Sequence, residues 1–206
     1  MVKVKICGIT NLEDALCAAL NGADALGFVF YRKSPRSITS SRAQRISRIL
    51  PAKILRAGVF VDEKISTVKA IARSCRLDLL QFHGKESPEY CRKFKGYKVI
   101  KAFRIAKPED LKQVSGYKCF AYLFDSFSRQ QRGGSGKKFN WKILAQADKM
   151  KPVVFLSGGL NPANVRQAIK LSKPGWVDVS SSLEALPGKK DHRRVKQFIQ
   201  AVRKGS

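Results

Sequence analysis

Short runs of apolar and β-branched residues recur along the chain, and amphipathic stretches separate them. These runs predict strands at residues 2–9, 25–30, 55–61, 77–83, 99–103, 119–125, 153–157 and 176–180. The runs are continuously apolar more than alternating, which is typical of strands whose two faces are both covered by protein. Between and after them, apolar residues repeat with a period of about 3.6 residues. This period predicts helices at residues 12–20, 42–50, 67–76, 88–94, 108–114, 141–147, 162–171 and 193–202.

Several of these helices begin with residues that favour a helix N-terminus. Asn11 stands immediately before the first helix, and Ser66 stands before the third. Side chains of this kind cap the free N–H groups of a first turn. Pro88, Pro108 and Pro162 occupy expected first-turn positions, where a missing backbone N–H costs nothing.

Strands and helices alternate strictly, which predicts parallel strands joined by right-handed crossovers. Eight such units share 206 residues, and this is close to the minimum length of a closed (β/α)8 barrel. An open, doubly wound sheet is the alternative architecture. The eight regular repeats leave no residues for a second domain, and no linker or composition break divides the chain. We therefore expect an α/β protein with one TIM-barrel domain over residues 1–206.

The composition is that of a globular protein, with 44% hydrophobic and 27% charged residues. No apolar run approaches the length of about 20 residues that spans a bilayer, and the N-terminus lacks the apolar core of a signal peptide. The cysteines are odd in number and form no Cys-x-x-Cys pair: Cys7, Cys17, Cys75, Cys91 and Cys119. This usage argues against a disulfide framework and favours a reducing, cytoplasmic location without membrane association.

The charge is the unusual property, because 41 Lys and Arg against 15 Asp and Glu give a net charge of +26. Such a charge suits a nucleic acid, a membrane surface, an anionic substrate or simply a basic surface. A nucleic-acid-binding protein would show a basic stripe with stacking aromatics or a groove-reading motif. Phe and Tyr fall mostly inside the strand runs, and Lys and Arg are spread over nearly every helix. We expect no specific nucleic-acid partner, and nucleic-acid binding remains the alternative of a different class.

Active sites of such barrels form at the C-terminal strand ends and in the loops that follow. The residues found there are Cys7, Arg36, Asp62, His83, Arg104, Asp125, Gly158, Gly159, Ser180, Ser181 and Ser182. The small residues follow the seventh and eighth strands, where barrels commonly bind phosphate through backbone N–H groups. The sequence therefore predicts a phosphate site formed by Gly158, Gly159, Ser180 and Ser181.

A second glycine cluster follows the sixth strand at residues 133–137. It does not fit a nucleotide P-loop, because Gln131 stands where that motif needs glycine and Lys138 stands where it needs Ser or Thr. A lid that closes over the site and a plain flexible connection are both consistent with this loop.

Three residues could carry proton chemistry. Cys7 could act as a base if nearby cations lower the pKa of its thiol, although a lone cysteine is often a small core residue. Asp125 follows an apolar run, so its carboxyl group is either buried and able to donate a proton or a turn cap. His83 is a base or a packed side chain, and His192 is expected on the surface. With only two histidines and no cluster of ligands, no metal site is expected.

The ordered motifs resemble a known family. They are KICGIT (5–10), ADALGFVF (23–30), SPR (34–36), GVFV (58–61), LLQFHG (79–84), the loop 133–141, SGGLNP (157–162) and VDVSS (177–181). Together they are similar to phosphoribosylanthranilate isomerase, a (β/α)8 enzyme of tryptophan biosynthesis. The resemblance extends over essentially the whole chain.

The resemblance implies an Amadori rearrangement of N-(5-phosphoribosyl)anthranilate to 1-(2-carboxyphenylamino)-1-deoxyribulose 5-phosphate, without metal or organic cofactor. It makes Cys7 the general base and Asp125 the general acid. It assigns Arg36 to the anthranilate carboxylate, and His83 and Asp178 to the substrate. Members are monomers or homodimers. A related phosphate-binding barrel isomerase or synthase of histidine or tryptophan biosynthesis is the closest alternative.

The chain departs from the family pattern at Ser182, where glycine is usual, and at Lys138 and Asn140 in the glycine-rich loop. If position 182 requires a positive φ, Ser182 is strained and one phosphate contact is lost. The two loop changes are expected to alter loop closure more than activity.

Overall fold

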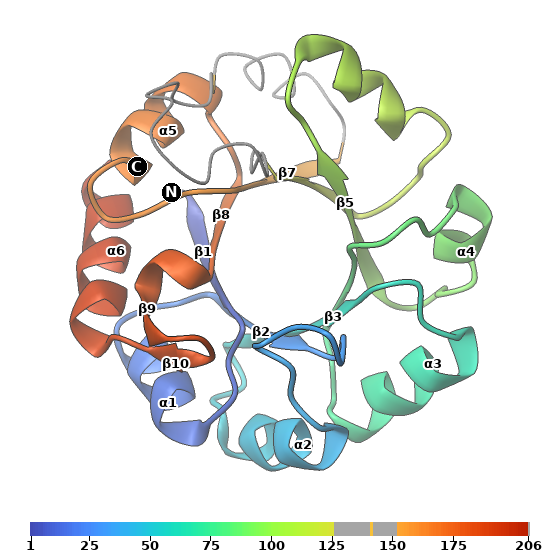
Figure 1. Cartoon of the computed structure of the whole chain (residues 1–206), viewed down its shortest axis with the longest axis horizontal. Coiled ribbons are helices and arrows are strands. Elements are labelled where there is room, and N and C mark those ends of the chain that lie inside the picture. Colours follow the sequence, from blue (N-terminus) through green and yellow to red (C-terminus); the bar gives the residue numbers. More distant parts are fainter. Residues whose placement is uncertain (126–140, 142–151, 206) are drawn as a thin grey trace.

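The first and last strands of the chain pair with each other, so the sheet closes into a barrel (Figure 1). The computed structural model describes residues 1–125, 141 and 152–205. Its strands run in the order β1 to β8 around the ring, and every neighbouring pair is parallel. They are β1 (Lys3–Cys7), β2 (Ala25–Val29), β3 (Leu55–Phe60), β4 (Leu79–Phe82), β5 (Lys98–Arg104), β6 (Ala121–Asp125), β7 (Val153–Ser157) and β8 (Trp176–Val179). The predicted TIM barrel is confirmed.

Helices surround the ring of strands (Figure 1). They are α1 (Leu12–Leu20), α2 (Ser40–Ile49), α3 (Ile65–Ser74), α4 (Pro88–Arg92), the 3-10 helix η1 (Pro108–Val114), α5 (Val165–Ser172) and α6 (His192–Lys204). The cap predicted at Asn11 is confirmed, because its side chain accepts a hydrogen bond from the backbone N–H of Asp14. Pro88 also stands in a first turn, behind a cap made by Ser87.

Three helix predictions differ from the structure. The third helix begins at Ile65, behind Lys64, so Ser66 is not its cap. The segment predicted from Pro108 is a 3-10 helix, not an α-helix. Pro162 precedes α5 without belonging to it, because Asn161 and Asn164 bond each other's backbone N–H groups in a turn that delays the helix. Of the helix predicted at residues 141–147, only Trp141 lies within the described residues.

The interior of the barrel is filled by side chains of unequal size. β2 and β3 contribute Ala25 and Ala57, whereas β7 and β8 contribute the stacked rings of Phe155 and Trp176, whose centroids lie 4.8 Å apart. Lys5 lies in this interior with none of its surface exposed. The larger part of the core lies between the strands and the surrounding helices. The continuous apolar runs are therefore explained by burial on both sides of each strand.

A short antiparallel ribbon follows β8 that the sequence pattern did not predict. After the 3-10 helix η4 (Ser181–Leu183), β9 (Glu184–Leu186) pairs with β10 (Lys189–Lys190). The ribbon lies near α1 and α6 in Figure 1. Its strands are too short to show an alternation of apolar and polar residues. They nevertheless place two charged side chains, Glu184 and Lys190, in buried positions.

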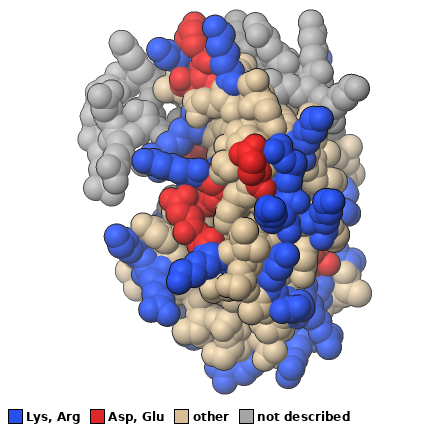
Figure 2. All heavy atoms as spheres, turned by 90° about the vertical axis from the view of Figure 1, so that its right-hand side faces the viewer, with Lys and Arg blue, Asp and Glu red and all other residues tan. Residues whose placement is uncertain are grey.

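Lys and Arg side chains are spread from one end to the other of the face that carries α3 and α4 (Figure 2). Acidic side chains form smaller groups between them. None of the helices within the described residues is long and apolar enough to cross a membrane.

The last helix packs on the barrel through an apolar stripe, which gives a test of the fold. Phe198 of α6 is fully buried, whereas Gln197 beside it is exposed. Phe198→Ala is expected to lower the free energy of unfolding by about 3–5 kcal/mol, because it leaves a cavity that the neighbours cannot fill. Gln197→Ala is the control and should change it by less than about 0.5 kcal/mol. Urea unfolding of both variants measures this, and equal effects would contradict the packing described.

Candidate active site

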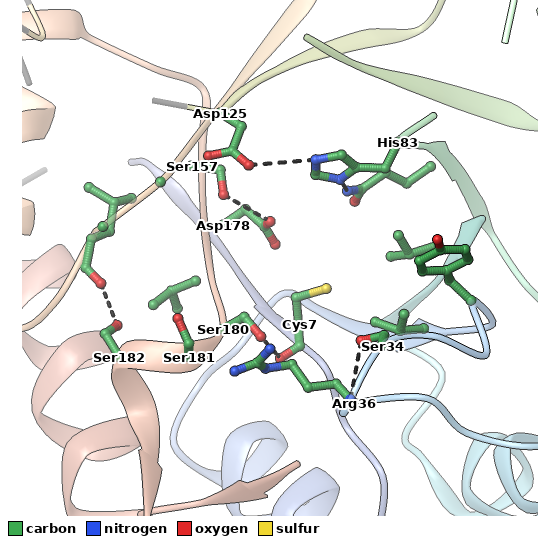
Figure 3. A pocket seen from close by; sticks show the side chains of 18 of the residues that line it. Cys7, Ser34, Arg36, His83, Asp125, Ser157, Asp178, Ser180, Ser181 and Ser182 are labelled. Carbon is green, nitrogen blue, oxygen red and sulfur yellow. Dashed lines mark hydrogen bonds and ion pairs between the residues drawn. The ribbon is translucent and has the colours of Figure 1, made fainter. Parts of the chain in front are cut away.

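A cavity of about 530 Å³ opens at the C-terminal ends of the strands. It is lined by all the residues that the sequence assigns to catalysis, substrate or phosphate: Cys7, Arg36, His83, Asp125, Gly158, Gly159, Asp178, Ser180 and Ser181 (Figure 3). They converge because parallel strands bring their C-terminal ends to one rim of the barrel. Asp62 and Arg104 do not join them. These two residues line a neighbouring cavity of about 550 Å³ above β3 to β5.

Cys7 ends β1, and its thiol points into the cavity (Figure 3). Its carbonyl oxygen accepts a hydrogen bond of 3.1 Å from Ser180 Oγ. Burial raises the pKa of the Cys7 thiol above its ordinary value. The ammonium group of Lys5 opposes this rise, Asp178 adds to it, and Lys190 also opposes it. Nearby cations therefore do not lower the pKa of the Cys7 thiol below its ordinary value, the condition considered for a basic Cys7, because desolvation outweighs them.

Asp125 ends β6 and faces His83 across the mouth of the barrel (Figure 3). Asp125 Oδ2 lies 3.5 Å from His83 Nε2, and the Asp125 side chain is 20% exposed. The Gln81 side-chain amide nitrogen lies 3.0 Å from His83 Nδ1. An amide nitrogen can only donate, so in this orientation Nδ1 accepts and Nε2 carries the proton that faces Asp125. The carboxyl group thus has a proton-bearing neighbour and access to the cavity.

Arg36 lies in the loop after β2 and is held by Glu184. Arg36 Nε and Nη2 donate to the two carboxylate oxygens of Glu184, at 2.8 and 2.7 Å. Lys190 Nζ lies 3.1 Å from Glu184 Oε1. Burial would raise the pKa of Glu184, but Arg36 and Lys190 outweigh it and hold the pKa below its ordinary value. A bidentate pair of this kind fixes the plane of the guanidinium group.

Glu184 and Lys5 are site residues that the sequence reasoning missed. Glu184 is separated from Arg36 by 148 positions and follows no recognisable motif. Lys5 did carry a signal, because a lysine stands between the apolar residues Val4 and Ile6 inside a strand. Lys5 Nζ lies 2.6 Å from Asp178 Oδ1, and Ser157 Oγ donates to Asp178 Oδ2 at 3.3 Å.

The two small-residue loops face the same cavity from β7 and β8. Gly158 and Gly159 have φ values of +91° and +66°, which favour glycine. The hydroxyl of Ser182 donates to the carbonyl oxygen of Leu160, so a side chain of one loop is bound to the other loop (Figure 3). The strain considered for Ser182 is absent, because Ser182 lies in η4 and does not have a positive φ.

Two further expectations concern residues outside this cavity. His192 is not simply a surface residue, because His192 Nε2 lies 2.9 Å from Oδ1 of the buried Asp14. The glycine-rich loop 133–137, with Lys138 and Asn140, lies outside the described residues. Among residues 1–125, 141 and 152–205, no group of three or more His, Cys, Asp or Glu side chains could hold a metal ion.

The Glu184 pairs give a test that needs no activity. A carboxyl group with a lowered folded-state pKa stabilises the fold above its ordinary pKa of 4.5, and this contribution is lost as the pH falls through the folded-state value. Glu184→Gln is therefore expected to lower the free energy of unfolding by about 1–3 kcal/mol near neutral pH. The difference from the unsubstituted protein should shrink below pH 4.5. Urea unfolding over a pH series measures this, with the exposed Glu109→Gln as control; a pH-independent difference would contradict it.

The chain matches a known protein family over nearly its whole length. The family model of N-(5'-phosphoribosyl)anthranilate (PRA) isomerase matches residues 4–201. The N-(5'-phosphoribosyl)anthranilate isomerase of Thermotoga maritima is 49% identical over 202 residues, which cover 97% of this chain and 98% of that protein. The enzyme of the same name from Trichlorobacter lovleyi is 47% identical over 200 residues, which cover 97% of both.

Solved structures show the same likeness. The crystal structure of phosphoribosyl anthranilate isomerase from Thermotoga maritima matches with a TM-score of 0.93 and 46% identity, over 99% of this chain and all of that one. A structure of such an isomerase in complex with reduced 1-(o-carboxyphenylamino)-1-deoxyribulose 5-phosphate matches with a TM-score of 0.90 and 44% identity, over 99% of this chain and 100% of that one. Thiamine phosphate pyrophosphorylase from Pyrococcus furiosus, at 15% identity and a TM-score of 0.68, shares the fold alone.

Proposed function

Since the chain belongs to the N-(5'-phosphoribosyl)anthranilate isomerase family, an isomerase family of tryptophan biosynthesis, we propose that its cavity performs the Amadori rearrangement by acid–base catalysis. The substrate is N-(5'-phosphoribosyl)anthranilate, and the product is 1-(2-carboxyphenylamino)-1-deoxyribulose 5-phosphate. The observation that carries the mechanism is that Cys7 and Asp125 line one cavity, together with the two small-residue loops and Arg36.

The two ends of the substrate carry negative charge, and both have candidate partners among the residues that line the cavity. The phosphate binds the backbone N–H groups of Gly158 and Gly159 and the turn at Ser180 and Ser181. The anthranilate carboxylate binds the guanidinium N–H groups of Arg36 that Glu184 does not use. This orientation puts the ribose between the loops and the arginine, where Cys7 and Asp125 face the cavity (Figure 3).

Asp125 acts first, as the general acid. Its proton goes to the ring oxygen of the furanose, the bond between that oxygen and C1 breaks, and the nitrogen lone pair forms an iminium ion. Because His83 Nε2 lies 3.5 Å from the carboxylate, His83 stabilises the charge that the departing proton leaves on Asp125.

Cys7 acts second, as the general base. Its thiolate takes the proton from C2, and the electrons of the C2–H bond form the C1–C2 double bond while those of the iminium bond return to nitrogen. The resulting enaminol tautomerises to the ketone product. Both steps move only protons and electron pairs within the substrate, so no redox cofactor is needed. Asp178 also lines the cavity, where it pairs with Lys5.

Removing either group tests the assignment. Cys7→Ala and Asp125→Asn are each expected to lower kcat by about 10²–10⁴-fold, the usual contribution of a positioned acid or base. The measurement is the loss of phosphoribosylanthranilate on mixing with purified protein. Cys17→Ala on α1, outside the cavity, is the matched control and should keep normal turnover. Near-normal turnover of a folded Cys7→Ala or Asp125→Asn variant would rule out that residue's role.

Arg36 is expected to act through binding. Arg36→Met removes the guanidinium group and leaves the Glu184 carboxylate with Lys190, so KM should rise by about tenfold or more, since a charge-assisted hydrogen bond contributes about 1.5–3 kcal/mol. The steady-state kinetics of this variant check the expectation. An unchanged KM would mean that the substrate carboxylate has another partner. Turnover of other phosphoribosyl compounds in the same assay separates this function from that of a related phosphate-binding barrel.

A further inference from the structure

Lys5 is a charged residue in the interior of a barrel that is otherwise filled by apolar side chains below the cavity. It has no exposed surface and stands two residues before Cys7 on β1. Side chains at positions i and i+2 of a strand point to the same face. Lys5 therefore lies directly below Cys7, on the side of the strand that faces the barrel interior.

Asp178 pairs with Lys5 across the β1–β8 pairing that closes the barrel. The two residues are register partners on β1 and β8, and Lys5 Nζ lies 2.6 Å from Asp178 Oδ1. Ser157 Oγ of β7 donates to the other carboxylate oxygen, at 3.3 Å. A buried ammonium group needs such a partner, because its desolvation is costly without one. The carboxylate is thus held from two strands and in turn holds the lysine.

The positive charge of the Lys5 ammonium group also acts on the thiol of Cys7, two residues along the same strand. Burial raises the pKa of Cys7, and Lys5 is the strongest of the groups that lower it. Burial alone would lower the pKa of Lys5, but Asp178 and Cys7 hold it above its ordinary value. Within the described residues, the other charged or titratable groups that line this cavity are Tyr31, Arg36, His83 and Asp125; Glu184 pairs with Arg36, and Lys190 pairs with Glu184.

The neighbouring strand leaves room for the sulfur atom. Gly27 of β2 is the register partner of Cys7, and a methyl group at position 27 would come within 2.7 Å of Cys7 Sγ. Ala25 is the register partner of Lys5 on the same strand. These small residues give the thiol and the ammonium group space to lie one above the other.

We propose that Lys5 is a positioning residue of the isomerase site, whose ammonium group holds the Cys7 thiolate and balances its charge while Asp178 holds Lys5 in place. The proposal rests on the role of Cys7 as the base. When the thiolate takes the C2 proton of the substrate, the C2–H bond breaks and an S–H bond forms. Lys5 keeps its own proton throughout, and its charge is then balanced by Asp178 alone.

The test is the pH dependence of Cys7 alkylation by iodoacetamide, because only the thiolate reacts. Mass spectrometry of the Cys7 peptide distinguishes alkylation of Cys7 from alkylation of the other cysteines, Cys17, Cys75, Cys91 and Cys119. In Lys5→Met, the midpoint should rise by about one to three pH units. At a fixed pH below the midpoint, the alkylation rate should fall about tenfold for each pH unit by which the midpoint rises. In Asp178→Asn, the midpoint should fall, because the charge that disfavours the thiolate is gone and Lys5 remains.

The opposite signs distinguish this role from a purely structural one, which would impair both variants alike. Lys3→Met is the matched control, since Lys3 lies on the same strand but is exposed at its other end, and its midpoint should not change. Should Lys5→Met fail to fold, the double variant Lys5→Met/Asp178→Asn removes both charges and is still expected to show a raised midpoint. An unchanged midpoint in the folded variants lacking Lys5, or shifts of the same sign in both single variants, would overturn the proposal.

The same variants separate this inference from the proposed function. Full turnover by Cys7→Ala would refute Cys7 as the base, and with it the catalytic meaning of Lys5. If Cys7→Ala is inactive but Lys5→Met has the same alkylation midpoint as the unsubstituted protein, the role of Lys5 is refuted and that of Cys7 is not. The pH profile of kcat/KM gives a second readout: it should rise with pH beyond 9.0, the ordinary pKa of the thiol, and Lys5→Met should shift that rise to still higher pH.

Discussion

The pairing of β1 with β8 closes the barrel, and the candidate site depends on this seam. It joins residues that are more than 170 positions apart, and two contacts cross it beside the cavity. The Lys5–Asp178 ion pair lies below the Cys7 thiol, and Ser180 Oγ holds the Cys7 carbonyl group. Without closure, the thiol would lose the nearby charge of Lys5 on that side, and the loop at Ser180 would lose its hydrogen bond to β1.

The electrostatics of the site follow from a conflict between burial and charge. A base that works on a carbon-bound proton benefits from exclusion of water, yet the same exclusion disfavours its ionised form. Two cations lower the pKa of the buried thiol, and each is paired with a carboxylate: Lys5 with Asp178, and Lys190 with Glu184. The paired carboxylates keep each buried ammonium group stable, and the thiol still experiences the nearer positive charge.

The same principle organises the outer part of the site, where Glu184 holds Arg36. A guanidinium group fixed in this way loses little conformational freedom when a carboxylate binds, which favours affinity. The high net charge of the chain is a separate property. Figure 2 shows Lys and Arg side chains over the whole of one outer face, where they raise the general attraction for anions.

Local sequence determined the elements and the location of the site. The hydrophobic period distinguishes strands from helices, and the alternation of the two predicts parallel pairing. Because all parallel strands then end at one rim, position grouped Cys7, Asp125 and the loops at Gly158 and Ser180. Position also grouped Asp62 and Arg104, which line another cavity, and the roles of Cys7 and Asp125 rested on the resemblance to a known family. The predicted helix start at Pro162 was wrong because the side chains of Asn161 and Asn164 bond backbone N–H groups in a turn that precedes the helix.

Only the tertiary structure decided which charged side chains meet. Nothing near Arg36 in the sequence points to Glu184, and nothing near His192 points to Asp14. These pairs depend on the register of strands and on the path of short loops between distant segments. The direction of the shift in the Cys7 pKa was likewise beyond the sequence, because desolvation and Asp178 raise this pKa while Lys5 and Lys190 lower it. Periodicity is a local property of the chain, whereas burial and the distance between charges exist only once the chain has folded.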